Sequence, residues 1–258
     1  MKVLHICSMA GVAELLAKEM GKGNVVLQVK SLDNFGFGRH YRNTQYYLDY
    51  QTVIDVAHIV ENQFDKIVIH DFNEFVGEFP KEKTFIYFHG SKLRGLGEEK
   101  IKEVQSRVSG VFLSTPDLLS FCTGGKVIPQ PIDLSMFYNM ELPRTEECVS
   151  IQRQYQYDEI STMVNQDFPE CQVIDRIKNF RSYREMPIYL NTIENYIDYK
   201  YDYSNPPKAV KVPSCTGLQA LACGCRVYGH DKQVLPISLL KDHDSRNIAR
   251  VFESCLEV

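Results

Sequence analysis

Short apolar runs alternate with stretches of helical periodicity along the first half of the chain. Each run is rich in Val, Ile and Phe and ends in small or polar residues, which is typical of strands buried on both faces of a parallel sheet. The runs lie at Lys2–Cys7, Val25–Val29, Lys66–His70, Thr84–Phe88, Gly110–Ser114 and Lys126–Ile128. Helices are predicted between them at Val12–Met20, Tyr46–Asn62, Glu98–Ser106 and Pro116–Cys122. This alternation predicts right-handed βαβ crossovers and a parallel sheet.

A proline-containing segment separates this half from a second alternating set. Pro129, Pro131 and Pro143 fall in a stretch of little periodicity, which indicates an interdomain linker at about 129–144. Strands are then predicted at Cys148–Gln152, Gln172–Asp175, Tyr196–Tyr199, Ala209–Val212 and Arg226–Gly229, and helices at Tyr155–Val164, Ser182–Asn191, Gly217–Cys223 and Ser245–Glu257. The predicted fold is α/β, with two Rossmann-like parallel-sheet lobes facing a cleft. Their bounds are 1–130 for the N-terminal domain and 145–258 for the shortened C-terminal domain. Ligands bind such sheets beyond the carboxyl ends of the strands.

Composition narrows the class of protein. Of the 258 residues, 44% are hydrophobic and 24% are charged, which is ordinary for a folded protein and argues against disorder. A formal net charge of -4 argues against nucleic-acid binding through bulk charge. No stretch has the length and purity of a transmembrane helix, and the first apolar run is too short for a signal peptide, so we expect a cytoplasmic protein, with peripheral membrane contact left open.

The cysteines do not form a metal-binding pattern. Eight cysteines are scattered, mostly in apolar runs, and are expected to be reduced core residues. The tight group Cys215, Cys223 and Cys225 lacks the paired spacing of a zinc knuckle, so no metal is expected.

The segment Ser214–Gly224 has the features of an anion-binding turn. Small residues follow a predicted strand and lead into strong helix-forming sequence, with Thr216 and Gln219 spaced as a capping box. The first N–H groups of such a helix point outward, and Gly217 leaves room for a ligand beside the backbone. This arrangement binds a phosphate or diphosphate without a metal. A capped α/β connection with no ligand explains the same residues equally well.

Four segments resemble a known family. Thr216–Val227 resembles the nucleotide-sugar-binding segment of GT-B glycosyltransferases of the GT4-like (group 1) type. Phe88–Gly95 resembles the N-lobe loop of archaeal-type members, Phe112–Leu119 the strand and turn before their linker, and Ile128–Phe137 the linker itself. The matches occur in the family's order and span Met1 to about Asp231.

This resemblance implies a glycosyltransferase that moves a sugar from a nucleotide diphosphate sugar to an unknown glycan, lipid or protein acceptor. The family binds the donor mainly with the C-terminal lobe and the acceptor mainly with the N-terminal lobe. By family analogy the reaction retains configuration and needs neither a cofactor nor a divalent metal. Thr216, Gly217, Leu218 and Gln219 would hold the donor diphosphate, where helix N–H groups stabilise charge on the leaving group.

Two positions depart from the family. Its paired glutamates fall on Lys211 and Gln219. Lys211 could pair with phosphate or be solvated, and Gln219 can hydrogen-bond a ribose without being a carboxylate. Arg153 is the nearest candidate for the family's phosphate-neutralising cations. A non-catalytic nucleotide-sugar-binding or scaffold protein of the same fold is the alternative. A nicotinamide enzyme is disfavoured because neither lobe has G-x-G-x-x-G.

Individual residues of the N-terminal lobe each have two interpretations. His89 is the predicted catalytic residue, hydrogen-bonding a sugar hydroxyl or donor phosphate, or else it caps a strand end. Arg94 is predicted to bind donor phosphate, or is a surface arginine. Gly11 allows a ligand to approach, or forms a tight turn. Arg39 belongs to a Gly-rich, aromatic stretch, Phe35–Arg42, which is an acceptor or phosphate loop or a plain connection to the next helix.

Overall fold

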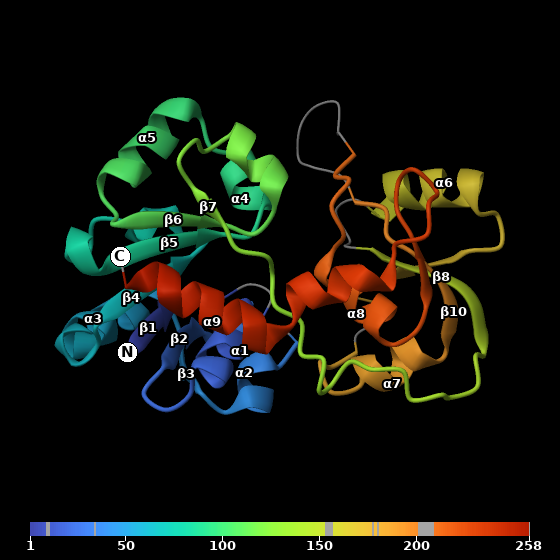
Figure 1. Cartoon of the computed structure of the whole chain (residues 1–258), viewed down its shortest axis with the longest axis horizontal. Helices are drawn as coiled ribbons and strands as arrows, with labels where there is room; N and C mark the ends of the chain where they lie inside the picture. Colours follow the sequence, from blue (N-terminus) through green and yellow to red (C-terminus); the bar gives the residue numbers. More distant parts are fainter. Residues whose placement is uncertain are drawn as a thin grey trace. The chain divides into compact units, whose positions relative to one another are not determined.

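The computed structural model describes residues 1–8, 11–33, 35–152, 157–176, 178–179, 181–200 and 209–257. The chain forms two compact units, which are coloured along the sequence in Figure 1. The first unit comprises Met1–Pro131 and His243–Val258, and the second comprises Ile132–Asp242.

The first unit is built on a seven-stranded parallel sheet in the order β3-β2-β1-β4-β5-β6-β7. The strands are β1 (Val3–Ile6), β2 (Val25–Val29), β3 (Thr44–Tyr47), β4 (Lys66–His70), β5 (Thr84–Phe88), β6 (Gly110–Leu113) and β7 (Lys126–Val127). The central strand β1 pairs with both β2 and β4, where Leu4 lies opposite Val25 and Ile67. Strand order reverses between β1 and β4, which makes their carboxyl ends the switch point at which such sheets bind ligands.

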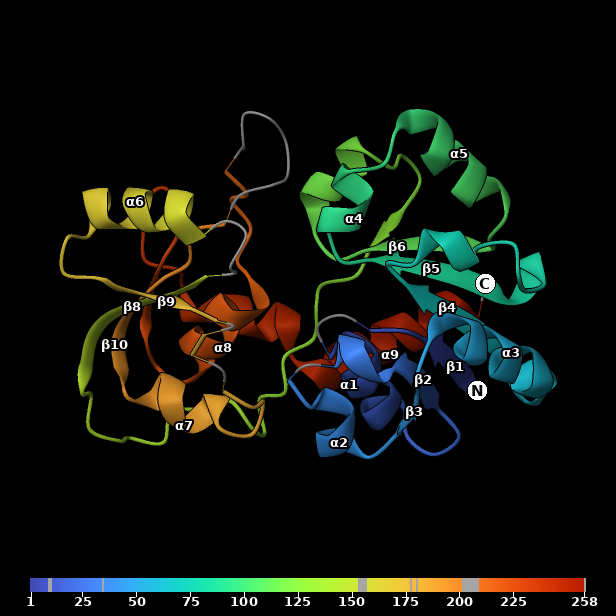
Figure 2. The ribbon, with the colours of Figure 1, turned by 180° about the vertical axis from the view of Figure 1, so that it is seen from behind.

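Helices cover both faces of this sheet. On one face, α1 (Val12–Met20) and α9 (Ser245–Leu256) share a core with β1, β4 and β5, and α9 crosses in front of the strands in Figure 1. The other face carries α3 (Tyr50–Val60) and α5 (Glu98–Ser106), with α3 nearer the viewer in Figure 2. Shorter helices are α2 (Phe37–Tyr41), α4 (Ser91–Arg94) and the 3-10 turns Lys30–Leu32, Glu61–Gln63, Asn73–Phe75, Lys81–Lys83 and Pro116–Ser120.

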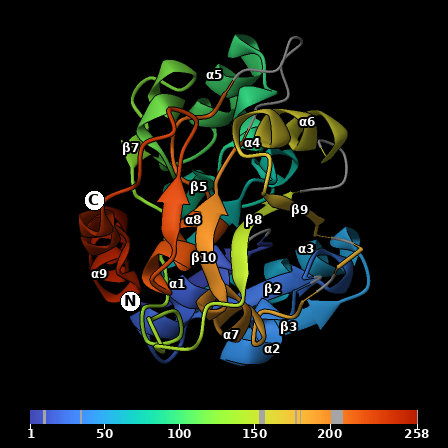
Figure 3. The same ribbon diagram turned by 90° about the vertical axis from the view of Figure 1, so that its right-hand side faces the viewer.

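The second unit has a four-stranded parallel sheet in the order β11-β10-β8-β9. Its elements are β8 (Glu146–Gln152), α6 (Tyr157–Asp167), β9 (Gln172–Asp175), α7 (Met186–Asn191), β10 (Ile193–Ile197), α8 (Cys215–Ala222), β11 (Arg226–Tyr228) and the 3-10 helix Ile237–His243. Figure 3 shows β8 and β10 side by side and running in the same direction. The predicted fold class, α/β with two parallel sheets, is therefore confirmed.

The helix predicted at Tyr46–Asn62 begins later than expected. Residues Thr44–Tyr47 instead form β3, which pairs with β2 at the sheet edge. Asp49 then acts as the N-cap of α3, because its carboxylate accepts a hydrogen bond of 2.8 Å from Thr52 N. The aromatic and β-branched residues of this stretch favour a strand, and the aspartate sets the start of the helix.

Two further elements differ from the sequence prediction. The segment Ala209–Val212 is not a strand: Val210 N donates to Lys200 O at 2.8 Å, and Pro213, which follows, has no N–H for a ladder. The last helix was expected in the C-terminal domain, but α9 packs in the first unit. Its apolar side, which includes Ile248 and Phe252, is buried against β1, β4 and β5 rather than against the second sheet.

Candidate functional site

His89 lies at the carboxyl end of β5 and belongs to a chain of three histidines. His5 Nδ1 lies 3.0 Å from His70 Nε2, and His70 Nδ1 lies 3.0 Å from His89 Nε2. The three rings come from β1, β4 and the end of β5, which are neighbours in the sheet. His89 N also donates to the Asp71 carboxylate at 2.8 Å, which holds the turn after β4 against the turn after β5.

Burial keeps this histidine chain neutral. It lowers the pKa of His5 to about 3 and the pKa of His70 well below its ordinary value. It also lowers the pKa of His89, against a smaller opposite effect of the Asp71 charge. At neutral pH His89 can therefore offer a hydrogen bond but no positive charge.

The hydrogen bonds link the proton positions of the three rings. Each neutral ring carries one N–H, so a donor at His5 Nδ1 makes His70 donate to His89 and leaves a proton on His89 Nδ1. The opposite arrangement leaves a bare lone pair on His89 Nδ1 and a proton on His5 Nε2. Within the described residues, neither of these two end atoms has a hydrogen-bond partner. The three hydrogen-bonded histidines can thus present His89 Nδ1 as a donor or as an acceptor with no change of net charge.

Arg94 is already engaged with another side chain. It ends α4, is 10% exposed, and its guanidinium lies 2.5 Å from the Asp117 carboxylate. The guanidinium also packs on Gly90, where an added Cβ would lie 2.8 Å from Arg94 Nη1. The described contacts give Arg94 a structural partner, so its role in phosphate binding stays a prediction.

Gly11 is explained by packing within the first unit. It precedes α1 with φ 72°, a backbone conformation that favours glycine. An added Cβ at this position would overlap the Phe37 ring of α2. Gly11 therefore allows α2 to lie close to the start of α1, and ligand approach there stays a prediction.

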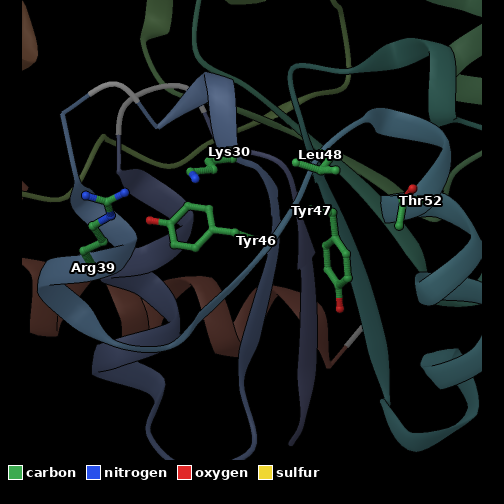
Figure 4. Close-up of a pocket in the computed structure, with 6 residues that line it drawn as sticks. All are labelled: Lys30, Arg39, Tyr46, Tyr47, Leu48 and Thr52. Carbon is green, nitrogen blue, oxygen red and sulfur yellow. The ribbon is translucent and has the colours of Figure 1, made fainter.

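Arg39 lines a pocket at the carboxyl ends of β2 and β3. The pocket has a volume of about 540 Å³ and is lined by Lys30, Arg39, Tyr46, Tyr47, Leu48 and Thr52 (Figure 4). The sequence placed Arg39 in an acceptor or phosphate loop, and the structure places it in α2 beside this pocket.

In the second unit, α8 starts two residues earlier than the sequence indicated. Ser214 is its N-cap, and Ser214 Oγ accepts a hydrogen bond of 2.9 Å from Gly217 N. The capping box predicted for Thr216 and Gln219 is therefore wrong, because both residues lie inside the helix. Cys215 and Thr216 occupy the first turn, and within the described residues neither of their backbone N–H groups meets an acceptor.

The room beside Gly217 is taken by an internal carboxylate. Asp198, which follows β10 and is 8% exposed, accepts hydrogen bonds from Ser214 N at 2.7 Å and Ser214 Oγ at 2.5 Å. An added Cβ on Gly217 would overlap the Asp198 carboxylate. The glycine is thus required by this carboxylate, and Asp198 stabilises the positive end of α8.

Two cations lie near the first turn of α8. Burial raises the pKa of the Cys215 thiol to about 11; the positive charges of Arg176 and Lys200 oppose this rise, and the negative charge of Asp198 adds a smaller contribution to it. Arg176 follows β9 and Lys200 follows β10, so both belong to the carboxyl edge of the second sheet. Arg153, the sequence candidate for this role, lies outside the described residues.

The remaining predicted donor residues differ in exposure. Leu218 and Gln219 are buried in α8, Thr216 is half-buried, and Lys211 is exposed in the segment before the helix. Thr216, Gly217, Leu218 and Gln219 are brought together by one helix. His89 and Arg94 are brought near each other by the loop after β5, in the first unit.

The sequence interpretation missed His5, His70, Asp198 and the pair Arg176 and Lys200. His5 and His70 stood inside predicted apolar strands, where a polar side chain is itself a signal that it meets a buried partner. Asp198, Arg176 and Lys200 follow strands of the same sheet, and carboxyl ends of parallel strands share one edge.

Two kinds of feature are absent from the part of the chain that the structure describes. No group of three or more His, Cys, Asp and Glu residues there is arranged to hold a metal ion. Nor does any described helix combine the length and apolar character needed to cross a membrane.

Comparison with known proteins gives a likeness of structure. No protein-family model matches the sequence, and no curated protein does. The crystal structure of Anabaena Alr3699/HepE in complex with UDP matches with a TM-score of 0.54 and 11% identity, over 100% of this chain and 90% of that chain. AviGT4, a glycosyltransferase involved in avilamycin A biosynthesis, matches with a TM-score of 0.63 and 9% identity, over 100% of this chain and 97% of that chain. At such identities the likeness shows the fold alone, and that fold is the GT-B architecture.

Proposed function

We infer that this chain is a glycosyltransferase that transfers a sugar from a nucleotide diphosphate sugar to an acceptor hydroxyl, with retention and without a divalent metal. The observation that carries this proposal is the carboxyl edge of the second sheet, where the first turn of α8 lies near Arg176 and Lys200. Outward N–H groups together with cations fit a diphosphate. A protein of similar fold whose structure contains UDP supports the same choice of ligand.

The diphosphate is assigned to the Cys215 and Thr216 side of the first turn. Asp198 occupies the space beside Gly217, and its negative charge repels an anion there. The N–H groups of Cys215 and Thr216 would bind the phosphate oxygens, and the charges of Arg176 and Lys200 would stabilise the negative charge that develops on the leaving group.

The reaction breaks the bond between the sugar and the donor diphosphate, and the bonding electrons leave with the diphosphate. The acceptor oxygen forms the new glycosidic bond, and its proton passes to the leaving phosphate. His89 is assigned a hydrogen bond to the sugar or to a phosphate oxygen. Because burial lowers its pKa, His89 makes this contact as a neutral ring.

A non-catalytic nucleotide-sugar-binding protein is the second candidate. The specific observation that favours it is the presence of Lys211 and Gln219 where the resembling family has glutamates. Lys211 is exposed and Gln219 is buried in α8, so neither position supplies a carboxylate to a ribose.

Calorimetric titration of the full chain with UDP, GDP and ADP tests the proposal, followed by assays of donor hydrolysis and transfer with and without EDTA. Arg176→Gln and Lys200→Gln are each expected to weaken diphosphate binding about tenfold or more, the usual effect of losing a charged hydrogen bond. Arg226→Gln is the matched control, because Arg226 begins β11 and therefore lies at the amino ends of the strands, away from the carboxyl edge that carries Arg176 and Lys200.

Each outcome separates the candidates. Absence of binding to all three diphosphates at millimolar concentration would overturn the proposal. Binding without turnover of any donor would favour the non-catalytic candidate. Activity that is lost in EDTA and restored by a divalent metal would contradict metal independence.

A further inference from the structure

The pocket of the first unit lined by Lys30, Arg39, Tyr46, Tyr47, Leu48 and Thr52 has no role in donor binding as assigned above. We call it the Tyr46 pocket. Its volume of about 540 Å³ is within the range of small-molecule sites. It lies at the carboxyl ends of β2 and β3, the edge at which parallel sheets bind ligands.

Two cations reach this pocket from different elements. Lys30 opens the 3-10 turn after β2, and Arg39 lies in α2. Both side chains are exposed, and within the described residues neither forms an ion pair. In Figure 4 the Tyr46 hydroxyl is directed toward Arg39, and the Lys30 side chain is drawn above the Tyr46 ring. The positive charge of Arg39 also acts on the Tyr46 hydroxyl.

A carboxylate beside the pocket, Asp33, is already used by the protein. Asp33 accepts hydrogen bonds from Phe37 N at 2.8 Å and Gly38 N at 3.0 Å, which hold the start of α2. It also accepts a very short hydrogen bond from the Tyr46 hydroxyl. Burial, followed by this hydrogen bond, raises the pKa of Tyr46, so the hydroxyl stays protonated. Asp33 thus fixes α2 and Tyr46, and most of its roughly four acceptor positions are in use.

A second carboxylate, Asp49, is used in the same way. It accepts from Thr52 N at 2.8 Å and from Thr52 Oγ1 at 3.0 Å, as the cap of α3. Thr52 lines the pocket, and its N–H and hydroxyl groups are already hydrogen-bonded to Asp49. The cations of the pocket therefore remain available to a ligand.

The pocket is held in shape by close packing of α2 on β3. An added Cβ on Gly38 would lie 2.5 Å from both Thr44 Oγ1 and Tyr46 Oη. Because α2 lies this close to Tyr46, Arg39 is carried on an element whose distance from the ring is set by the fold. Such preorganisation reduces the entropy lost when a ligand binds.

The other part of the lining is aromatic and apolar. Tyr47 is half-buried, and Leu48 is 86% exposed. A tyrosine ring can stack on a ring of a ligand, and an exposed leucine can pack against its apolar part. The lining is thus divided into a cationic part and an apolar part.

We propose that the Tyr46 pocket binds the acceptor substrate and selects one that carries a phosphate group. The phosphate is bound by Lys30 and Arg39, and the adjoining ring or apolar body packs on Tyr46 and Leu48, whose side chains share one face of the strand end, whereas Tyr47 points to the other face. Arginine recognises phosphate oxygens through its planar fork, and lysine adds a point charge. The role of this ligand as an acceptor rests on the proposed function. Phosphate binding in the pocket can be measured without any turnover.

Phenyl phosphate is the first probe, because it combines one ring with one phosphate. The full chain is first saturated with UDP, so that the α8 site is filled, and is then titrated by calorimetry with phenyl phosphate and with the neutral phenyl β-glucoside. Phenyl phosphate is expected to bind at least tenfold tighter than the glucoside. Lys30→Gln and Arg39→Gln are each expected to weaken phenyl phosphate about tenfold, which is a typical loss for one charge-assisted hydrogen bond.

Lys22→Gln is the matched control, because Lys22 is an exposed lysine outside the pocket lining. All three substitutions exchange an exposed cation for a neutral side chain, so stability is expected to change little. Co-sedimentation with phosphatidic acid vesicles, compared with phosphatidylcholine vesicles, distinguishes a lipid-borne phosphate from a soluble one. Arg39-dependent binding to either probe supports the proposal and identifies the source of the phosphate.

Equal affinity for phenyl phosphate and phenyl β-glucoside would overturn the proposal. So would unchanged phenyl phosphate affinity in both Lys30→Gln and Arg39→Gln, or no binding of either phosphate probe at millimolar concentration. Failure of the proposed function gives a different result, because UDP then fails to bind while the Arg39-dependent phosphate site persists.

Discussion

Replacing Glu14 with glutamine is expected to stabilise the protein at neutral and alkaline pH. Glu14 lies in the first turn of α1, yet it faces the interior and is 1% exposed. Burial raises the pKa of its carboxyl from an ordinary 4.5 to about 7, although hydrogen bonds from Ser8 and Gln28 partly oppose the rise. Within the described residues, its Oε2 atom has no hydrogen-bond partner.

The sign and size of the effect follow from this pKa. Between pH 4.5 and pH 7 the unfolded chain releases the Glu14 proton while the folded chain keeps it, so the free energy of unfolding falls as pH rises. The stabilising contribution is fully present below pH 4.5 and is lost as pH rises through 7. A difference of about 2.5 pH units corresponds to about 3 kcal/mol.

Urea unfolding at a series of pH values measures the effect. We expect the stability of Glu14→Gln relative to the wild type to increase by about 2.5 kcal/mol between about pH 5 and pH 8, because glutamine has the same shape and no charge to bury. Titration of other groups cancels in this difference. Glu99→Gln, at an exposed position of α5, is the control and should show no such trend. A difference between Glu14→Gln and wild type that is constant with pH would refute the reasoning.

Three further substitutions test the packing. Gly217→Ala forces its Cβ against Asp198, so we expect urea unfolding to show a loss of about 1–3 kcal/mol; an unchanged midpoint would contradict the close approach. His70→Leu removes both bonds of the central ring, so stability should fall by about 2 kcal/mol or more and the ring-nitrogen NMR shifts of His89 should change; unchanged shifts would exclude the hydrogen bond. Phe252→Ala should cost about 3–5 kcal/mol, because this ring is fully buried in the core of the first unit; a cost below about 1 kcal/mol would show that α9 does not stabilise that unit.

Most of the fold could be predicted from periodicity. Val12–Met20 was predicted with its observed bounds, and each apolar run of the first half became a strand. The secondary-structure predictions were wrong where a single residue decides whether a segment is a strand, a helix or a loop. Asp49, the N-cap of α3, stands two residues after an edge strand that looks helical in sequence, and Ala209–Val212 has strand-forming residues but no continuous partner.

The candidate site was predictable in position more than in detail. The sequence predicted a helix that begins close to Ser214 and singled out Gly217. The structure has this helix as α8, and Gly217 lies in it. It could not show that Gly217 gives space to Asp198, because the two residues are 19 positions apart and meet only when β10 and α8 pack together. Arg94 was likewise predicted to face a ligand, whereas its described partner is Asp117, from the turn after β6.

By itself, the sequence determined which segments are strands and helices and that they alternate in two sets. These features depend on the period of apolar side chains and on local caps, so they are written in neighbouring residues. The tertiary structure alone decided that α9 returns to the first sheet and that His5, His70 and His89 form one hydrogen-bonded chain. A periodic pattern records that a side chain is buried, but the identity of its partner depends on how distant segments pack.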